Sequence, residues 1–207
     1  GDPSLNVQVI ETLHNYSAKN SGEYSYTLPT VSAATGIVTF TFDNSDQTSG
    51  ETINVLLPIG SSTKVIYVKN GAGTDETITI TFNVRPEFTT TADIDKSIDE
   101  NTTDVKTFGT ADFKNALSGV TIVIGGEHGE YFEMNGSTLR LKTPVDFEDA
   151  SPKSFNITLT PRKSGTSGPS KNMTVTITNV NEEPTLSISD KTLNSWNNTS
   201  FTVEPSD

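Results

Sequence analysis

Two stretches of this 207-residue chain end in the same pattern, and that repetition limits what the chain can fold into. ETITITFNVRP (76–86) and NMTVTITNVNEEP (172–184) each alternate Thr with apolar residues, continue with Asn-Val and then reach a proline. Strict alternation predicts a half-buried β-strand, and a proline ends the ladder of backbone hydrogen bonds. Ile80 and Ile177 stand 97 residues apart, about the length of one β-sandwich domain. The repetition therefore predicts β-sandwich domains in series.

Short alternating runs separated by turn residues occur along the whole chain, and no amphipathic helical run interrupts them. This spacing favours an all-β fold of tandem sandwiches, each with two antiparallel sheets. We expect a first domain at 1–86, a second at 87–184 and the start of a further, truncated domain at 185–207. The polar segment 161–172 is expected to be a hairpin loop between the last two strands of the second domain. The predicted strands are 5–12, 24–29, 36–42, 52–58, 63–69, 77–84, 105–110, 120–126, 138–143, 155–161 and 173–180.

Composition excludes several classes of protein. The chain has 26 acidic against 14 basic residues and a net charge of −12, which argues against binding nucleic acid, because phosphates require a basic face. It contains no cysteine, so disulfides, thiolate metal sites and cysteine nucleophiles are absent. No run of 18 apolar residues exists, so we expect no membrane insertion in this segment. Thr-rich alternation (33 Thr, with 22 Ser, 15 Gly and 10 Pro in the chain) is typical of an all-β protein with many turns.

Four motifs follow one another in the second domain. They are IDEN (98–101), YFEMNGSTLRLKTPVDFE (131–148), FNITLTP (155–161) and VTITNVNEEP (175–184). In this order and spacing they resemble a cadherin-type repeat, in the divergent form common in large bacterial and protist surface proteins. The resemblance covers roughly residues 93–184. The first domain shares only the Asn-Val…Pro ending, and we predict it to be an immunoglobulin-like or degenerate cadherin-like sandwich.

The cadherin resemblance implies calcium at the joints between successive repeats. Ca²⁺ takes six to eight oxygen ligands from carboxylates, amides and backbone carbonyls. We expect one or two calcium ions at the joint after residue 184; the alternative is that these acids are simply hydrated residues at the base of the domain. The residues that match the family's ligand positions are Glu100, Asp146, Glu148, Asn181, Glu182 and Asp207.

This chain departs from the family's ligand pattern at several positions. Asn179 stands where the linker normally has Asp, and Pro161 or Arg162 stands where an Asp is expected after the strand NITLT. TADFKN (110–115) keeps Asp112 but lacks the second acid of an Asp-x-Asp pair. Fewer charged ligands predict a cluster of fewer than three ions and weak affinity, in the ~10⁻⁴–10⁻³ M range of extracellular modules.

The joint between the first two domains differs from the one after residue 184. Arg85 and Pro86 stand where the second joint has Asn181 and Glu182. A cationic side chain there repels a metal ion, so we expect no metal at this joint. It is then held by packing or left flexible.

Two further patterns resemble functional sites. DIDKSID (93–99) places acids or Ser at the first alternate positions of an EF-hand loop. However, Ile98 occupies the sixth position, which needs Gly, and Asp104 the twelfth, which needs Glu. We therefore predict a strand edge with outward acids. Asp146 and Glu148 resemble a glycosidase pair, but no aromatic-rich segment accompanies them.

We expect no catalytic residue in this chain, and we predict that the protein is not an enzyme. The only histidines, His14 and His128, belong to different predicted domains. We interpret both as surface or turn residues. Seven sequons match Asn-x-Ser/Thr and suggest glycosylation: Asn15, Asn101, Asn135, Asn156, Asn172, Asn197 and Asn198.

The sequence as a whole favours a non-enzymatic extracellular structural or adhesion module from a longer tandem-domain surface or filament protein. Its partners would be the neighbouring domains of the same chain. The alternative is recognition of a carbohydrate or protein ligand through sandwich loops, which exposed aromatics such as Tyr24, Tyr26 and Tyr131 on one face would favour. Adhesion by exchange of a strand anchored by a terminal Trp is not expected, because Trp196 is not terminal.

Overall fold

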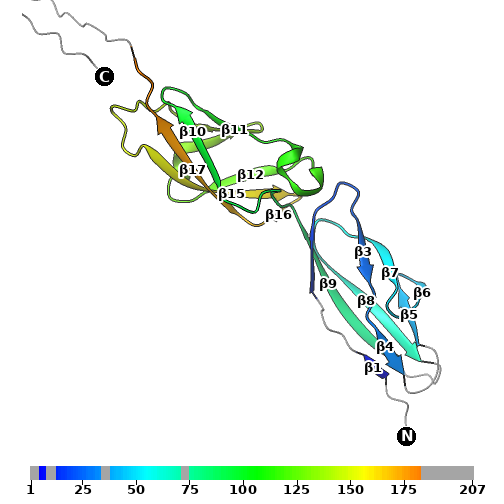
Figure 1. The fold of residues 1–207 in the computed structure, drawn as a ribbon. Coiled ribbons are helices and arrows are strands. Elements are labelled where there is room, and N and C mark those ends of the chain that lie inside the picture. Colours follow the sequence, from blue (N-terminus) through cyan, green and yellow to red (C-terminus); the bar gives the residue numbers. More distant parts are fainter. Residues whose placement is uncertain (1–4, 8–12, 34–37, 71–74, 183–207) are drawn as a thin grey trace, which may run out of the picture.

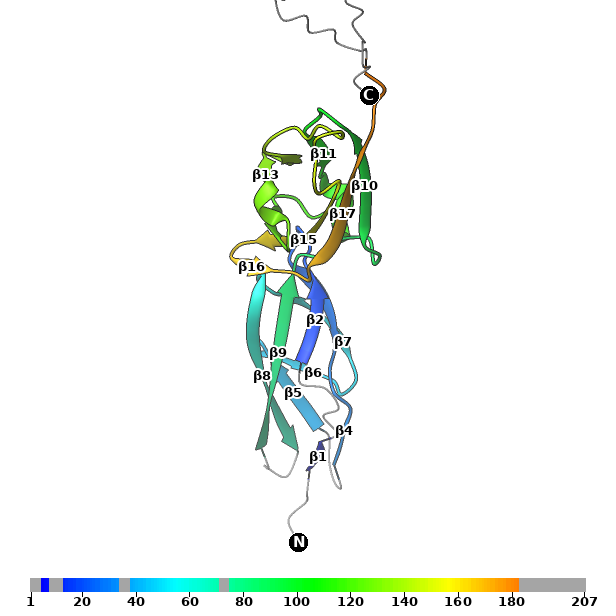
Figure 2. The ribbon, with the colours of Figure 1, turned by 90° about the vertical axis from the view of Figure 1, so that its left-hand side faces the viewer.

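The computed structural model describes residues 5–7, 13–33, 38–70 and 75–182, in which strands predominate and three short 3₁₀ helices occur. Two groups of sheets lie end to end and give an elongated molecule (Figures 1 and 2). The all-β, tandem-sandwich prediction is confirmed. In the part of the chain that the structure describes, no helix has the length and apolar character needed to span a membrane.

The first sandwich has a five-stranded sheet in the order β2-β9-β8-β5-β6, with β3 and β7 forming a second, two-stranded sheet and β1 and β4 a third. The strands are β1 (Leu5–Val7), β2 (Leu13–Ser17), β3 (Glu23–Thr27), β4 (Val31–Ala33), β5 (Val38–Phe42), β6 (Ser45–Gln47), β7 (Thr52–Leu56), β8 (Gly60–Asn70) and β9 (Asp75–Arg85).

The second sandwich sets a sheet of order β10-β17-β15-β12, with β16 attached to β15, against a sheet of order β11-β14-β13. Its strands are β10 (Ile94–Asp99), β11 (Asp104–Thr107), β12 (Thr121–Gly125), β13 (Phe132–Asn135), β14 (Thr138–Leu141), β15 (Ser154–Lys163), β16 (Thr166–Ser167) and β17 (Lys171–Thr178). The 3₁₀ helices are η1 (Thr110–Asp112), η2 (Lys114–Ala116) and η3 (Gly129–Tyr131).

The alternation in the sequence explains both cores. In β9, Ile78, Ile80, Phe82 and Val84 are buried, while Thr77 and Thr79 face solvent. β17 repeats this arrangement, with Met173, Val175 and Ile177 buried. Because successive side chains of a strand point to opposite faces, one Thr-apolar pattern supplies both a core and a hydrated surface.

The two sandwiches share one plan around their last strands. β9 pairs in parallel with β2 and antiparallel with β8, and β17 pairs in parallel with β10 and antiparallel with β15. Ile80 and Ile177, the residues that marked the sequence repeat, are 0% and 2% exposed in these two strands. The repeat in the sequence thus corresponds to a repeat in the fold.

Some expected elements differ from the structure. Segment 161–172 is mostly ladder rather than loop: β15 continues to Lys163, and β16 pairs back onto it. The turn is confined to Ser164 and Gly165, with φ of 49° and 81°. Two consecutive residues with positive φ are enough to reverse the chain between two antiparallel strands. The strands β2, β4, β6 and β13 were not predicted. Of the strand expected at 5–12, residues 8–12 lie outside the described residues, as does the further domain expected at 185–207.

Candidate functional site

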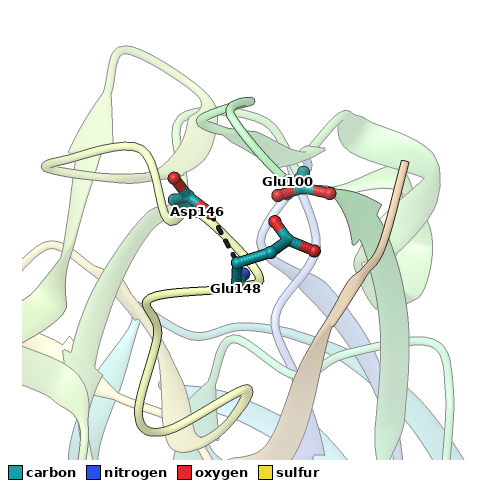
Figure 3. Close-up of side chains that lie close together, drawn as sticks. All are labelled: Glu100, Asp146 and Glu148. Carbon is teal, nitrogen blue, oxygen red and sulfur yellow. Dashed lines mark hydrogen bonds between the residues drawn. The ribbon is translucent and has the colours of Figure 1, made fainter. Parts of the chain in front are cut away.

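Three carboxylates meet at the end of the second sandwich from which the chain leaves β17. Glu100 directly follows β10, while Asp146 and Glu148 belong to the segment between β14 and β15. One carboxylate oxygen from each of the three lies within 4.8 Å of the others. Figure 3 shows the side chains pointing toward one another from two separate loops. The structure therefore brings together three of the six predicted metal ligands.

Glu100 is the anchor of this cluster and is only 3% exposed. Its Oε2 accepts a hydrogen bond from the Phe147 backbone N–H and its Oε1 one from the Val180 N–H, both at 2.7 Å. These two N–H donors, that of Val180 first, hold the pKa of Glu100 below its ordinary value. One charged side chain thus fixes both the acidic loop and the segment that leaves β17.

Glu148 is exposed, as is Asp146, and its carboxylate lies close to two other acidic groups. Its backbone N–H donates to Asp146 Oδ1 at 3.0 Å, and the Asn179 side-chain amide donates to its Oε1 at 2.6 Å. Partial loss of hydration, together with the nearby carboxylates of Asp146 and Glu100, raises the pKa of Glu148.

Negative charge in the cluster is not balanced by an ion pair. None of the ion pairs formed among the described residues involves Glu100, Asp146 or Glu148. Lys153 is directed instead at the Phe147 ring, with its Nζ 3.6 Å from the ring centroid. The arrangement gathers oxygen ligands around a site of excess negative charge.

The linker residues lie beside this cluster. Glu182 accepts a hydrogen bond at 2.9 Å from the side-chain amide of Asn101, the neighbour of Glu100. Asn181 is exposed next to it. Asp207 lies outside the described residues. The role of Asn179 was missed at the sequence level: it occupies the position of an expected Asp, and its amide donates a hydrogen bond to Glu148.

Two of the departures from the family pattern belong to the opposite end of the second sandwich. Arg162 pairs with Ser167 of β16, which lies next to the first sandwich (Figure 2). Asp112 forms an ion pair with Lys106 at 2.8 Å, and its backbone carbonyl accepts from Thr89 N–H. These positions therefore lie away from the carboxylate cluster and supply no ligand to it, and the number of ions at that joint stays a prediction.

Neither of the other two patterns forms the site that it resembles. In DIDKSID, β10 exposes Asp95, Ser97 and Asp99 and buries Ile98, so the predicted strand edge with outward acids is confirmed. Asp146 borders a cavity of about 480 Å³, whereas Glu148 does not line it. The pair that resembled a glycosidase site therefore does not face a common cleft.

Both histidines have packing roles. His14 lies edge-on to Tyr26, with 5.1 Å between ring centroids. His128 packs edge-on against Phe155 at 5.7 Å, and its Nδ1 accepts a hydrogen bond from the Asn156 backbone N–H at 3.0 Å. Each imidazole ring thus packs against neighbouring aromatic rings within its own β-sandwich domain.

The predicted aromatic recognition face is wrong for two of its three residues. Tyr24 and Tyr26 are 2% and 3% exposed and belong to the core of the first sandwich. The pattern EYSYT could have indicated this, because two tyrosines at alternate positions lie on one face of a strand. Tyr131 is 44% exposed and lines the cavity of about 480 Å³ beside Asp146 and Asp149.

Most of the sequons lie on the surface. Asn156 is exposed on β15, so it is not crowded into the core. Asn197 and Asn198 lie outside the described residues. The other exposed sequon asparagines are Asn15, Asn101, Asn135 and Asn172.

Comparison with solved structures finds tandem β-sandwich proteins. Mouse cadherin-23 EC22-24 is 15% identical, with a TM-score of 0.37 over 86% of this chain and 66% of that one. Drosophila N-cadherin EC1-4 is 15% identical, with a TM-score of 0.39 over 88% of this chain and 52% of that one. An I-band fragment of titin is 14% identical, with a TM-score of 0.30 over 88% and 69%.

Neither the protein-family models nor the curated protein sequences compared with this chain give a match. The chain spans 66% of the cadherin-23 fragment and 43% of the human desmocollin-1 ectodomain. The similarity concerns the shape of the chain. The functional argument therefore rests on the side chains described above.

Proposed function

We propose that this chain is a non-enzymatic structural or adhesion module of a longer extracellular tandem-domain protein, stiffened by calcium where the chain leaves the second sandwich. The single observation that carries the proposal is the meeting of Glu100, Asp146 and Glu148 within 4.8 Å at that end of the domain. The four ordered motifs of a divergent cadherin-like repeat support the same conclusion.

The ligands present fit calcium. All three side chains offer carboxylate oxygens, which are hard ligands, and neither a His nor a Cys belongs to the group. Each oxygen of Glu100 already accepts one N–H, and a carboxylate has about four lone-pair sites, so both oxygens retain acceptor capacity. Asn179 and Glu182 lie beside the group and would complete the coordination from the linker.

Binding of a divalent cation would link the domain end to its neighbour. Glu100 already fixes Phe147 and Val180, so an ion held by this carboxylate would tie the acidic loop to the outgoing chain. It would also offset the repulsion by Asp146 and Glu100, which adds to partial loss of hydration in raising the pKa of Glu148. In the following domain, ligands such as Asp207 would complete the joint, and the chain would act as a spacer of fixed direction in a surface protein or filament.

Recognition through sandwich loops is the second candidate. One observation favours it: Tyr131, Asp146 and Asp149 border a cavity of about 480 Å³. A half-exposed aromatic ring beside acids is suited to a carbohydrate or to a cationic group of a protein ligand. Mutation of Tyr131 to Ala, followed by glycan-array and pull-down binding assays, distinguishes this role from that of a spacer.

A calcium titration monitored by thermal melting tests the first proposal. The second sandwich should melt at a higher temperature as calcium is added, and magnesium should have a smaller effect, because Mg²⁺ demands octahedral geometry at shorter distances. Glu182→Ala should weaken the response, and Glu100→Gln should abolish it. Identical melting curves with calcium and with chelator would contradict the calcium site, and the chain would then be a spacer that binds no calcium.

A further inference from the structure

The joint between the two sandwiches contains a carboxylate that is bound from both sides. Glu87 has a side chain 16% exposed. Its Oε2 accepts from Lys114 Nζ at 2.7 Å and from Ser17 Oγ at 3.0 Å, and its Oε1 accepts from Arg85 Nε at 3.3 Å. Ser17 ends β2 of the first sandwich, and Lys114 begins η2 of the second. One side chain therefore connects the two domains.

The charge of Glu87 is balanced by the protein itself. Burial acts to raise the pKa of Glu87, but hydrogen bonds from Lys114, Ser17 and Arg85 outweigh it and hold that pKa below its ordinary value. Lys114 stands two residues after Asp112, where the sequence lacks the second acid of an Asp-x-Asp pair. Its ammonium group supplies positive charge at this joint together with the Arg85 guanidinium.

Two asparagines cross the same joint in opposite directions. Asn115 of the second sandwich donates its side-chain N–H groups to the carbonyls of Ser17 and Ala18, both at 3.1 Å. Asn20 of the first sandwich donates to the Ala116 carbonyl at 3.1 Å and accepts from Ser118 N–H at 3.1 Å. Asn20 uses both the donor and the acceptor group of its amide, so these contacts restrict the relative orientation of the two domains as well as their separation.

A third contact comes from the hairpin of β15, β16 and β17. A Cβ atom added to Gly168 would lie 1.7 Å from the Pro86 carbonyl oxygen, so the hairpin rests directly on the linker. Thr166 at the hairpin tip faces Gly60 of the first sandwich, with its Oγ1 3.3 Å from the position of a Cβ at that glycine. Figure 2 shows β16 at this junction.

From these contacts we infer that the joint between the two sandwiches is a metal-independent clamp that holds them at one angle, with Lys114 and Arg85 supplying the positive charge. The salt-bridge network, the two asparagines and the glycine contact involve different elements. A change of angle must therefore break at least one of them. This inference does not depend on calcium binding at the other end of the second sandwich.

Distance measurement between the domains tests the clamp. The chain has no cysteine, so Thr77→Cys on β9 and Val123→Cys on β12, both at exposed positions, accept one spin label each. Pulsed electron–electron double resonance should give one narrow distribution of distances between the two spin labels, and the distribution should be the same with chelator and with millimolar calcium. A broad distribution, or one that narrows only with calcium, would overturn the inference.

A matched pair of glycine variants identifies the contact. Gly168→Ala should shift or broaden the distance distribution, because its methyl group collides with Pro86. Gly109→Ala should leave it unchanged, because an added methyl group there meets nothing within 4 Å. Glu87→Gln offers a second test that adds no atoms in the tight contact, and it should broaden the distribution as well. A wild-type distribution in both Gly168→Ala and Glu87→Gln would refute the clamp.

Discussion

Glu148→Gln is the substitution that most sharply separates a calcium site from a cluster of hydrated acids. The side chain keeps its shape and can still accept the hydrogen bond from Asn179, but it loses the charge that faces Asp146 and Glu100. The variant should melt at a higher temperature than the wild type without calcium, because like-charge repulsion is removed. In calcium it should gain much less than the wild type, because a charged ligand is missing.

The magnitude of the wild-type gain follows from mass action. With few charged ligands, the dissociation constant should fall near ~10⁻⁴–10⁻³ M. Free calcium at about 10–100 times that constant stabilises the folded protein by ~1.4–2.7 kcal/mol. For a domain of this size the stabilisation raises the melting temperature by roughly 6–20 °C. Glu148→Gln should lose most of this shift.

Differential scanning calorimetry of the whole chain measures the effect, because the transition of the second sandwich should move while that of the first stays in place. Asp149→Asn is the matched control: it removes the same charge at an exposed neighbouring position outside the cluster. Its calcium response should equal that of the wild type. The reasoning is refuted if Glu148→Gln gains as much from calcium as the wild type and the control do.

Three further outcomes are expected. Without calcium, the raised pKa of Glu148 means that its contribution to stability is greatest at acidic pH and is lost as pH rises through that pKa. The lowered pKa of Glu100 gives stability that is lost as pH falls through it. The melting temperature, followed by circular dichroism, should therefore pass through a maximum as pH is varied, and calcium should broaden this maximum toward neutral pH. Asn179→Asp should lower the calcium-free melting temperature and tighten calcium binding measured by isothermal titration calorimetry, since it adds a fourth acid beside Glu148; weaker binding would contradict the assigned role of Asn179. Phe155→Ala should cost about 3–5 kcal/mol in urea unfolding of the second sandwich, because this ring is 2% exposed, and a loss below about 1 kcal/mol would show that the core is wrongly placed.

The sequence predicted the fold wherever alternation was strict. β9 and β17 were predicted closely, because each carries a Thr-apolar pattern that only a half-buried strand explains. β2, with the sequence LHNYS, was missed. Its partner is β9, more than sixty residues away, and its pairing is parallel, so no local turn signal accompanies it.

The candidate site was predictable in part. Ordered motifs identified Glu100, Asp146 and Glu148, which the fold then places together. The direction of a side-chain hydrogen bond was not predictable, so the sequence identifies Asn179 only as a departure from the expected Asp and not as a hydrogen-bond donor to Glu148. The clamp at the first joint was likewise not predictable, because Asn20 and Asn115 belong to no sequence pattern and each finds its hydrogen-bond partners in the other domain.

A calcium titration followed by amide NMR tests the central claim most directly. Phe147 and Val180 donate their backbone N–H groups to Glu100, so their resonances report on its carboxylate. Both should shift saturably with calcium, while the amide of Lys114 at the first joint should not. Unchanged Phe147 and Val180 resonances, or shifts of equal size at Lys114, would contradict a calcium site at the end of the second sandwich.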